Sequence, residues 1–289
     1  MKQISKLFFI LFFLTIYFTI YGCSKERIEQ KTEVNSVKNS EEIYQTKLKN
    51  VLKEISGLAV TDDGRLFGHN DELGVIYEIN PKTGEIIKRF ELGTFGITGD
   101  FEGLAFANSK FYLTESNGTL YEFSEGSNNS SVKFKTFKTG FSSKFEIEGL
   151  CYYPESNVLL FASKDYPGKN YKGFRTVYAF SLESYSLLPE PFLKVEIDKI
   201  NSELKNKGFF PSGIEYNKFT NTFFIISSKG QKAIVEINTD GELLMVEKLK
   251  GKYHKQPEGI AFLHDGTMVI ADEGVKGNAT LTVYPAPNK

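Results

Sequence analysis

Cysteine and histidine are scarce in this chain of 289 residues, and positive charge is not in excess. The two cysteines are Cys23 and Cys151, and there are three histidines. The sequence contains 35 Lys and Arg and 36 Asp and Glu, so positive and negative charges nearly balance. So few cysteines provide no disulfide framework and no paired-cysteine metal site. A near-neutral chain without a basic stripe does not have the electrostatics of a nucleic-acid-binding protein. The sequence also has no phosphate loop and no nucleophile elbow.

The first 22 residues have the pattern of a signal peptide. Lys2 and Lys6 precede an uncharged apolar run over residues 7–21, and Gly22-Cys23 follow. A cysteine directly after the small residue resembles the signal of bacterial lipoproteins, in which the cysteine becomes the lipidated first residue. We therefore expect a lipid anchor at Cys23. The alternative is an uncleaved membrane anchor, although the run is short for a spanning helix, which needs about 20 residues.

Residues 23–42 are polar and charged, and they bury too little apolar surface to offset the entropy of ordering. We predict a flexible tether there, which would hold the protein to a membrane of the cell envelope, facing the periplasm or the exterior. Residues 43–289 then suit one all-β domain, a class that reaches about 250 residues without division.

A short motif returns five times along this domain. It consists of Ser or Glu, then Gly, then Leu or Ile. Its glycines are Gly57, Gly103, Gly149, Gly213 and Gly259, so the spacings are 46, 46, 64 and 46 residues. Self-similarity at such a period indicates a repeat architecture. Cys151 stands two residues after its glycine, where Ala105 stands in the preceding repeat, so we expect it to fill a small buried position.

Each repeat contains short β-rich runs separated by turn residues. In the first repeat they lie at 58–60, 66–67, 75–79 and 86–90. Four strands per repeat are the unit of a β-propeller. The one long spacing contains Phe192–Lys207, where Val195, Ile197, Ile200 and Leu204 suggest an inserted helix.

The last repeat is incomplete, because the chain ends soon after the run Leu281–Tyr284. Before the first motif lies Ile43–Leu48, an alternating run without a blade of its own. We predict that it supplies the missing outer strand and closes the ring, which removes an exposed sheet edge. The expected fold is an all-β, five-bladed propeller of four-stranded blades.

At this point the motifs resemble a known family. They are Ser56-Gly57-Leu58-Ala59, Asn70-Asp71-Glu72, Glu102-Gly103-Leu104-Ala105-Phe106, Glu148-Gly149-Leu150 and Gln256-Pro257-Glu258-Gly259-Ile260-Ala261-Phe262. Together they are similar to the SdiA-regulated family of bacterial envelope proteins, itself distantly similar to NHL-repeat propellers. The resemblance covers about Glu42 to Tyr284. It implies a five-bladed propeller with a calcium ion at a shared site, and it brings no established biochemical activity.

The motif opens the first strand of each blade, and these strands line the central channel. Five side chains should therefore meet at one mouth: Ser56, Glu102, Glu148, Ser212 and Glu258. The second strand is antiparallel, so its end lies beside this mouth. Those ends form a second, largely acidic layer: Asn70-Asp71-Glu72, Glu115, Lys164-Asp165, Ser227-Ser228 and Asp272-Glu273.

Three carboxylates near one axis repel one another, so they either bind protons or need a cation. Carboxylate and hydroxyl oxygens suit calcium, and the absence of His and Cys from these positions argues against zinc. The predicted ligands are Glu102, Glu148 and Glu258. Further candidates in the outer layer are Glu115, Asp165, Asp272 and Glu273. The alternative is a structural role, in which the glutamates cap backbone amides or pair with Lys164.

We expect a monomeric, non-catalytic module of the cell envelope that binds calcium, a membrane through its lipid anchor, and a protein, glycan or small ligand. The alternative is a calcium-dependent hydrolase, resembling lactonase or phytase-like propellers, in which the ion activates water. Such chemistry needs a base, and His69, near the predicted mouth, is the histidine to test. His264, in the Asp265-Gly266 turn, is expected to be a solvated turn residue.

Overall fold

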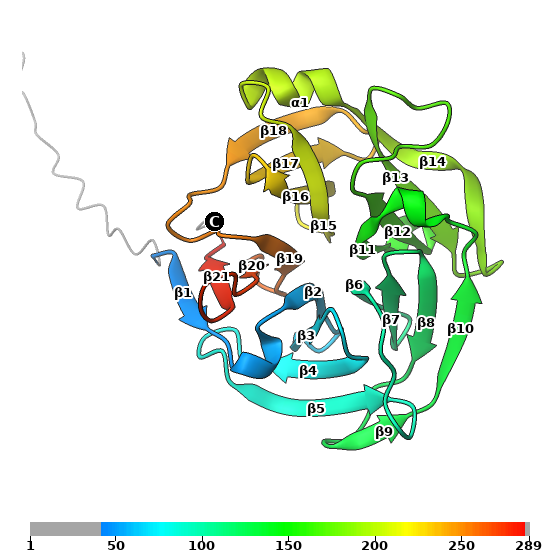
Figure 1. Cartoon of the computed structure of the whole chain (residues 1–289), viewed down its shortest axis with the longest axis vertical. Coiled ribbons are helices and arrows are strands. Elements are labelled where there is room, and N and C mark those ends of the chain that lie inside the picture. The colour runs from blue at the N-terminus through cyan, green and yellow to red at the C-terminus, as the bar shows by residue number, and fades with distance from the viewer. Residues whose placement is uncertain (1–41, 287–289) are drawn as a thin grey trace, which may run out of the picture. The chain divides into compact units, whose positions relative to one another are not determined.

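The computed structural model of the chain describes residues 42–286, which form five β-sheets around a central channel (Figure 1). Each sheet is one blade, and its strands follow one another outwards from the channel. The predicted all-β, five-bladed propeller is therefore confirmed. The signal peptide, most of the tether and Cys23 lie outside the described residues.

Blades 1 and 2 interlock through one exchanged strand. Blade 1 contains β2 (Ile55–Val60), β3 (Leu66–Asn70), β4 (Val75–Ile79), β5 (Ile86–Leu92) and β9 (Ser130–Val132). Blade 2 contains β6 (Phe101–Ala107), β7 (Lys110–Glu115), β8 (Thr119–Phe123) and β10 (Phe134–Lys138). Strand β9 lies between β8 and β10 in the sequence but pairs parallel with β5. Blade 1 thus has five strands where four were predicted, and its outer edge is covered.

Blades 3 and 4 flank the long repeat spacing. Blade 3 contains β11 (Ile147–Tyr153), β12 (Val158–Ser163), β13 (Phe174–Ser181) and β14 (Ser186–Glu196). Blade 4 contains β15 (Phe209–Asn217), β16 (Thr222–Gly230), β17 (Ala233–Asn238) and β18 (Leu243–Lys248). The inserted helix α1 (Ile197–Glu203) is shorter than predicted over 192–207. Residues 192–196 continue β14, because Leu193 and Val195 alternate with exposed residues, which is the period of a strand.

Blade 5 joins the two ends of the domain. It contains β19 (Pro257–Phe262), β20 (Met268–Asp272), β21 (Thr280–Tyr284) and β1 (Tyr44–Lys47). Strand β1 pairs antiparallel with β21, with Tyr44 opposite Val283. Just beyond it, the backbone N–H of Leu48 donates to the carbonyl of Ala279 at 2.8 Å. The predicted closure of the ring by residues 43–48 is confirmed.

The five motif glycines explain how the inner strands β2, β6, β11, β15 and β19 contact one another in a ring. A Cβ atom at Gly103 would lie 2.8 Å from the backbone nitrogen of Leu150, and one at Gly149 would lie 2.9 Å from that of Ile214. Gly57, Gly213 and Gly259 approach their neighbours similarly. The repeat therefore needs glycine because each blade packs its backbone against the backbone of the next.

The apolar core lies between neighbouring blades. One cluster combines side chains of blades 3 and 4, such as Cys151, Val177 and Phe223, and another combines blades 1 and 2 around Phe67 and Phe111. The two phenylalanine rings meet edge to face with centroids 4.9 Å apart. Cys151 is 1% exposed, in agreement with the small buried position predicted for it.

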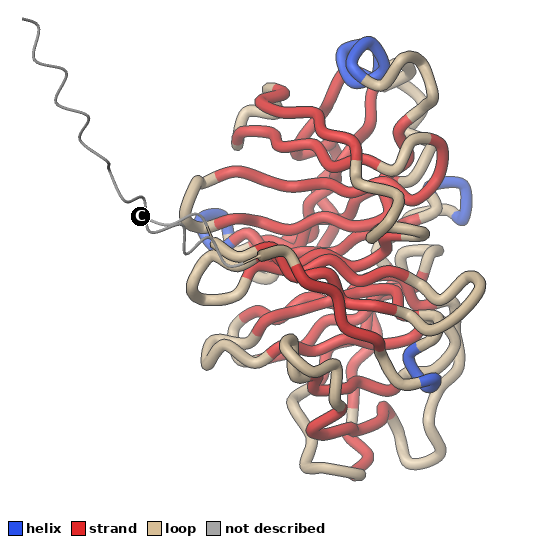
Figure 2. Tube along the Cα trace, turned by 90° about the vertical axis from the view of Figure 1, so that its left-hand side faces the viewer, coloured by secondary structure: helices blue, strands red, loops and turns tan. Residues whose placement is uncertain are grey.

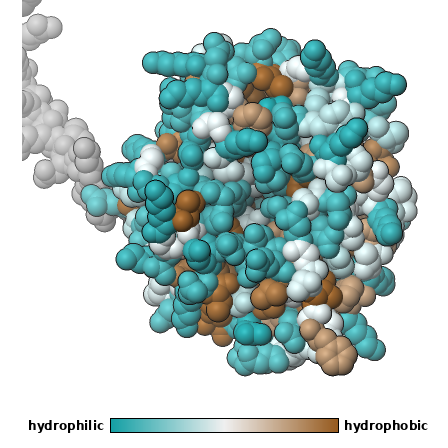
Figure 3. Space-filling view, viewed as in Figure 1, coloured by the Kyte–Doolittle hydropathy of each residue, from teal (hydrophilic) through white to brown (hydrophobic). Residues whose placement is uncertain are grey.

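The strands run across the molecule, and the turns and loops gather at its two faces (Figure 2). Short 3-10 turns are formed by Asn50–Leu52, Ser143–Phe145 and Pro154–Ser156. The face seen in Figure 1 is largely hydrophilic, with apolar side chains gathered near its lower edge, over blade 1 (Figure 3). A helix long and apolar enough to span a membrane is absent from residues 42–286.

Candidate functional site

A β-bulge places the motif side chains at the mouth of the channel. In every blade the register between the first and second strand shifts at the motif residue, for example between Phe101 and Gly103 and between Ile147 and Gly149. The same shift occurs in the other three blades. A bulge bends the strand and re-aims a side chain. The predicted convergence of inner-strand starts and second-strand ends thus has a local structural cause.

The three glutamates lie within electrostatic reach of one another. Burial, followed by the nearby charge of Glu148, raises the pKa of Glu102 well above its usual range. Burial and the charge of Glu148 likewise raise the pKa of Glu258, to about 8. Burial also raises the pKa of Glu148, and the ammonium of Lys164 opposes that rise. The group is therefore short of positive charge, and its members favour protons or a cation.

Each of the three carboxyl groups has a polar partner, which for Glu258 is the side chain of Gln256. The Lys164 ammonium donates to Glu148 Oε1 at 2.7 Å, and the Ser56 hydroxyl donates to Glu102 Oε2 at 3.0 Å. From the sequence, the alternative to a metal site is a structural role, in which a glutamate pairs with Lys164. The ion pair of Glu148 with Lys164 is that contact, and it involves one of the three glutamates. Ser212 is used differently, because its hydroxyl donates to the carbonyl of Pro257 at 2.6 Å. The cavity beneath the glutamates measures about 10 Å³, which is close to the space for one water-sized particle.

More acidic groups surround this mouth than the motif alone indicates. Asp100 and Glu146 stand two residues before Glu102 and Glu148, and their charges raise the pKa of these glutamates. Sequence reasoning missed both, although an acid two residues before the motif also occurs at Glu54. Asp71 has a buried carboxylate oxygen, Oδ1, without a hydrogen-bond partner. Burial, with the charge of Glu54, raises its pKa to about 6.

The four outer-layer candidates have partners in or beside their own blades. Glu115 accepts hydrogen bonds from Asn117 Nδ2 at 2.7 Å and the Tyr121 hydroxyl at 2.8 Å. Asp165 forms an ion pair with Arg175 at 3.2 Å, and its side chain is 63% exposed.

At the other outer positions, Asp272 is buried and lies 2.7 Å from His254 Nδ1. It also accepts from the backbone N–H of Gln256. Glu273 accepts a hydrogen bond from the Gln256 side chain, and of the four it alone adds to the charge that raises the pKa of Glu258. The structure therefore brings together Glu102, Glu148 and Glu258, with Glu273 nearby. Among residues 42–286, no three His, Cys, Asp or Glu side chains are already arranged around a common metal position.

The histidines occupy three different environments. His69 is fully buried, and burial lowers its pKa to about 4. Its Nδ1 lies 2.8 Å from the carbonyl of Asn70, and its Nε2 is buried without a partner. His254 is buried between Asp272 and the hydroxyl of Tyr284, a pairing that the sequence did not indicate. His264 is exposed in a turn, as predicted.

The described propeller is similar to solved structures of other proteins. The glutaminyl cyclase of Myxococcus xanthus has a TM-score of 0.55 and 13% identity, covering 83% of this chain and 94% of that chain. A catalytically inactive virginiamycin B lyase from Staphylococcus aureus, solved with quinupristin, has a TM-score of 0.51 and 15% identity, covering 84% and 99%. At these identities the likeness shows the fold alone.

No curated protein matches the sequence. The family model described as SdiA-regulated matches residues 186–285, which extend from β14 to just beyond β21. The resemblance to the SdiA-regulated family, predicted from the repeated motifs, is therefore confirmed, with the match located in the last strand of blade 3 and in blades 4 and 5.

Proposed function

We propose that this propeller is a non-catalytic binding module of the cell envelope, with a calcium ion bound at the glutamate mouth of its channel. The observation that carries the proposal is the shortage of positive charge there. Glu102, Glu148 and Glu258 converge, and Lys164 is the cation whose charge acts on all three. A divalent cation would satisfy the two carboxylates that this ammonium leaves without a direct ion pair.

The donors at this mouth suit calcium by their chemistry. They are carboxylate oxygens on five-fold related strand starts, and hard oxygen ligands in variable number are what calcium accepts. The buried Oδ1 of Asp71, which has no partner, adds a further oxygen of the same kind near the mouth. Calcium binding would require the glutamates to ionise and to move toward a common point, which couples the ion to the packing of the inner strands.

The hydrolase alternative finds less support in the contacts of this mouth. Activation of a metal-bound water needs a base within reach of the ion and of solvent. His69, the base proposed for that chemistry, is 0% exposed. Its low pKa keeps it neutral, and its Nε2 is enclosed beside Gly57 of the inner strand.

The envelope location belongs to the same proposal and rests on the sequence of the first 42 residues. Replacement of the lipidated position by Cys23→Ser should leave an unprocessed precursor that carries no fatty acid. Metabolic labelling with palmitate tests this, and equal labelling of wild type and Cys23→Ser would refute the anchor.

Calcium-dependent stability tests the ion site. Calcium binds only the folded arrangement of the glutamates, so it should raise the melting temperature, and a chelator should lower it. The variant Glu102→Gln/Glu148→Gln/Glu258→Gln keeps the side-chain shapes and removes their charge. It should stay folded and lose the calcium response.

A matched control removes three exposed acids instead. The variant Glu183→Gln/Glu203→Gln/Glu247→Gln changes the net charge equally and should keep the full calcium response, because these side chains are exposed and stand neither in the motif nor at the end of a second strand. A wild-type melting curve unmoved by calcium or chelator, with no heat in a calcium titration, would leave the glutamates a purely structural role.

A further inference from the structure

The other end of the channel holds one carboxyl group that breaks the repeat. Three residues after each motif Ser or Glu, the inner strands carry Ala59, Ala105, Cys151, Glu215 and Ala261. Four of these five are small and at most 3% exposed. Three residues of strand place this level about 10 Å from the glutamate mouth. Glu215 is therefore the one charged side chain at its level, surrounded by positions that leave room for it.

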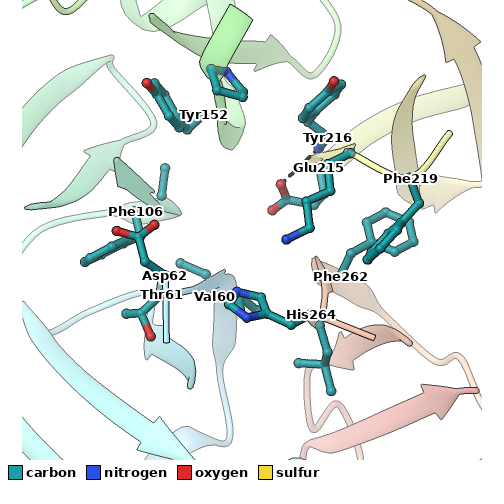
Figure 4. Close-up of a pocket in the computed structure, with 15 residues that line it drawn as sticks. Val60, Thr61, Asp62, Phe106, Tyr152, Glu215, Tyr216, Phe219, Phe262 and His264 are labelled. Carbon is teal, nitrogen blue, oxygen red and sulfur yellow. Dashed lines mark hydrogen bonds between the residues drawn. The ribbon is translucent and has the colours of Figure 1, made fainter. Parts of the chain in front are cut away.

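Glu215 lies in a cavity of about 180 Å³ to which every blade contributes. In Figure 4 its carboxyl group points into the middle of the cavity, with Phe106, Tyr152 and Phe262 around it. These three aromatic side chains stand at the next position of their inner strands and are half-buried. A cavity with apolar walls and few convergent polar groups is the usual form of a small-molecule site.

No cationic side chain among residues 42–286 forms an ion pair with Glu215. Its Oε1 accepts a hydrogen bond from the backbone N–H of Tyr216 at 2.9 Å. Burial raises the pKa of Glu215 to about 8, and that one hydrogen bond opposes the rise. The carboxyl group also lies close enough to Cys151 to contribute to the raised pKa of that thiol.

The charged groups of the cavity rim do not neutralise this carboxyl group. Asp62 adds negative charge, and His264 is exposed in its turn. Lys218 also lines the cavity, but its ammonium lies 5.5 Å from the centre of the Phe219 ring and forms no ion pair with the carboxyl group of Glu215. An acid held in a partly apolar cavity without a cationic partner costs free energy that an alanine would not, and a cationic ligand would offset that cost.

We infer that this cavity binds a small primary amine that carries an apolar group. The protonated amine would donate to the carboxylate of Glu215, a charge-assisted hydrogen bond in a partly desolvated place. Its apolar group would pack on Phe106, Tyr152 and Phe262, whose ring faces also attract the positive charge. The assignment rests on the proposed binding function and names its ligand class, but it does not require the calcium ion.

Titration calorimetry with benzylammonium chloride tests the assignment at pH 8, with and without a chelator. Wild type should bind in both conditions. Glu215→Gln keeps the shape of the side chain and should weaken binding at least tenfold. Glu215→Ala, which restores the small residue of the other blades, should weaken it as much and should fold well. Benzyl alcohol, which has the same size but no charge, should also bind at least tenfold more weakly than the amine.

The rim acid provides the matched control. Asp62→Asn removes one negative charge from the same cavity and should change the affinity less than threefold, because the proposal places the amine on Glu215. Equal binding to wild type and Glu215→Gln, equal binding of the alcohol, or no heat from wild type at millimolar amine would each overturn the assignment.

The calcium response of the same samples keeps this inference apart from the ion proposal. Stabilisation by calcium without any binding of the amine would refute the amine site and leave the ion in place. Binding of the amine that Glu215→Gln abolishes, in a protein that does not respond to calcium, would support the amine site and refute the ion.

Discussion

The two ends of the channel show opposite ways in which a repeated fold collects charge. At one mouth, Glu102, Glu148 and Glu258 occupy the same position of three repeats, and the ring brings them together. At the other end, Glu215 is acidic where four blades have Ala or Cys. The first site exists because three repeats carry the same residue at one position. The second exists because one repeat carries a different residue from the other four.

This contrast affects how the charges are balanced. The charge of Glu148 raises the pKa of Glu102 and of Glu258 in addition to the effect of burial, and Lys164 opposes the rise at Glu148 and Glu258. Glu215 has its pKa raised by burial alone. The mouth is therefore a site where charges interact, whereas the cavity is a site where one charge is isolated. A bound metal ion would balance the charges at the mouth, and a ligand with a single positive charge would balance Glu215.

The largest expected effect of a single substitution concerns the five motif glycines, which lie between the two ends of the channel. In Gly103→Ala the added Cβ would lie 2.8 Å from the backbone nitrogen of Leu150, which cannot move without shifting blade 3. We expect a loss of about 3 kcal/mol in the free energy of unfolding. The melting temperature should fall on the order of 10 °C. The geometry of the glutamate mouth and of the Glu215 cavity should both change. Urea unfolding and thermal melting measure the change.

Gly251→Ala is the matched control, since a Cβ there would have no heavy atom within 4 Å. It should change the free energy of unfolding by less than about 0.5 kcal/mol, as surface substitutions usually do. If the two glycine variants were equally stable, the inner strands would not pack as closely as the structure places them.

The second prediction acts on the glutamate mouth alone. Lys164→Met leaves Glu148 without its ion pair, and the loss of a partner for a buried acid should cost about 2 kcal/mol at pH 8. The loss should shrink at pH 5, where Glu148 can bind a proton instead. Adding Glu148→Gln should restore most of the stability, which a double-mutant cycle measures. A cost independent of pH would mean that Lys164 stabilises the blade by packing rather than by its charge.

The third prediction compares the two ends through pH. The pKa of Glu215 and of Glu258 is about 8 in the folded protein, against about 4.3 for an unfolded glutamate. Stability from the protonated form is thus complete below about pH 4.3 and is lost as the pH rises through 8. For these pKa values, linkage gives wild type a loss of roughly 4 kcal/mol between pH 5 and 9 relative to Glu215→Gln or Glu258→Gln.

Calcium should separate these two profiles. At the mouth it would hold the ionised carboxylates, so the difference between wild type and Glu258→Gln should flatten when calcium is present. The difference between wild type and Glu215→Gln should remain. Urea unfolding across the pH range measures both. If calcium flattened both differences, the two ends would not be independent, and if it flattened neither, the ion would not bind at the mouth.

Much of the fold was predictable because the ring repeats its sequence. Equal spacings of 46 residues between motif glycines indicated the blades, and the orphan run at 43–48 indicated the closure. The parallel strand β9 was not predictable, because Ser130–Val132 is three residues long and its partner β5 lies 40 residues earlier. Residues 192–196 were assigned to a helix because Val195 fitted the helical spacing of the residues that follow it.

The sites divide in the same way. The convergence of Glu102, Glu148 and Glu258 followed from strand direction, since identical positions of a closed ring face one axis. The partners of the outer acids did not follow, because the contact of Asp272 with His254 depends on how the loop before β19 folds back. Glu215 was visible in the fourth motif, but only the cavity of the folded ring shows that the position is open enough to take a ligand.

The smallest expected effect concerns Cys151, which stands beside Glu215 at the same level of the channel. Burial is the main cause that raises the pKa of this thiol, so it should not react with a maleimide reagent while the protein is folded. Cys151→Ala introduces the residue that three other blades have at this position and should change the free energy of unfolding by less than about 1 kcal/mol. Cys151→Val would instead add a branched side chain against Glu215 and should weaken binding of the amine without affecting the calcium response. Labelling of the folded protein would show that the Cys151 thiol is accessible rather than buried. A loss of calcium stabilisation in Cys151→Val would show that the two levels of the channel are coupled through β11 rather than separate.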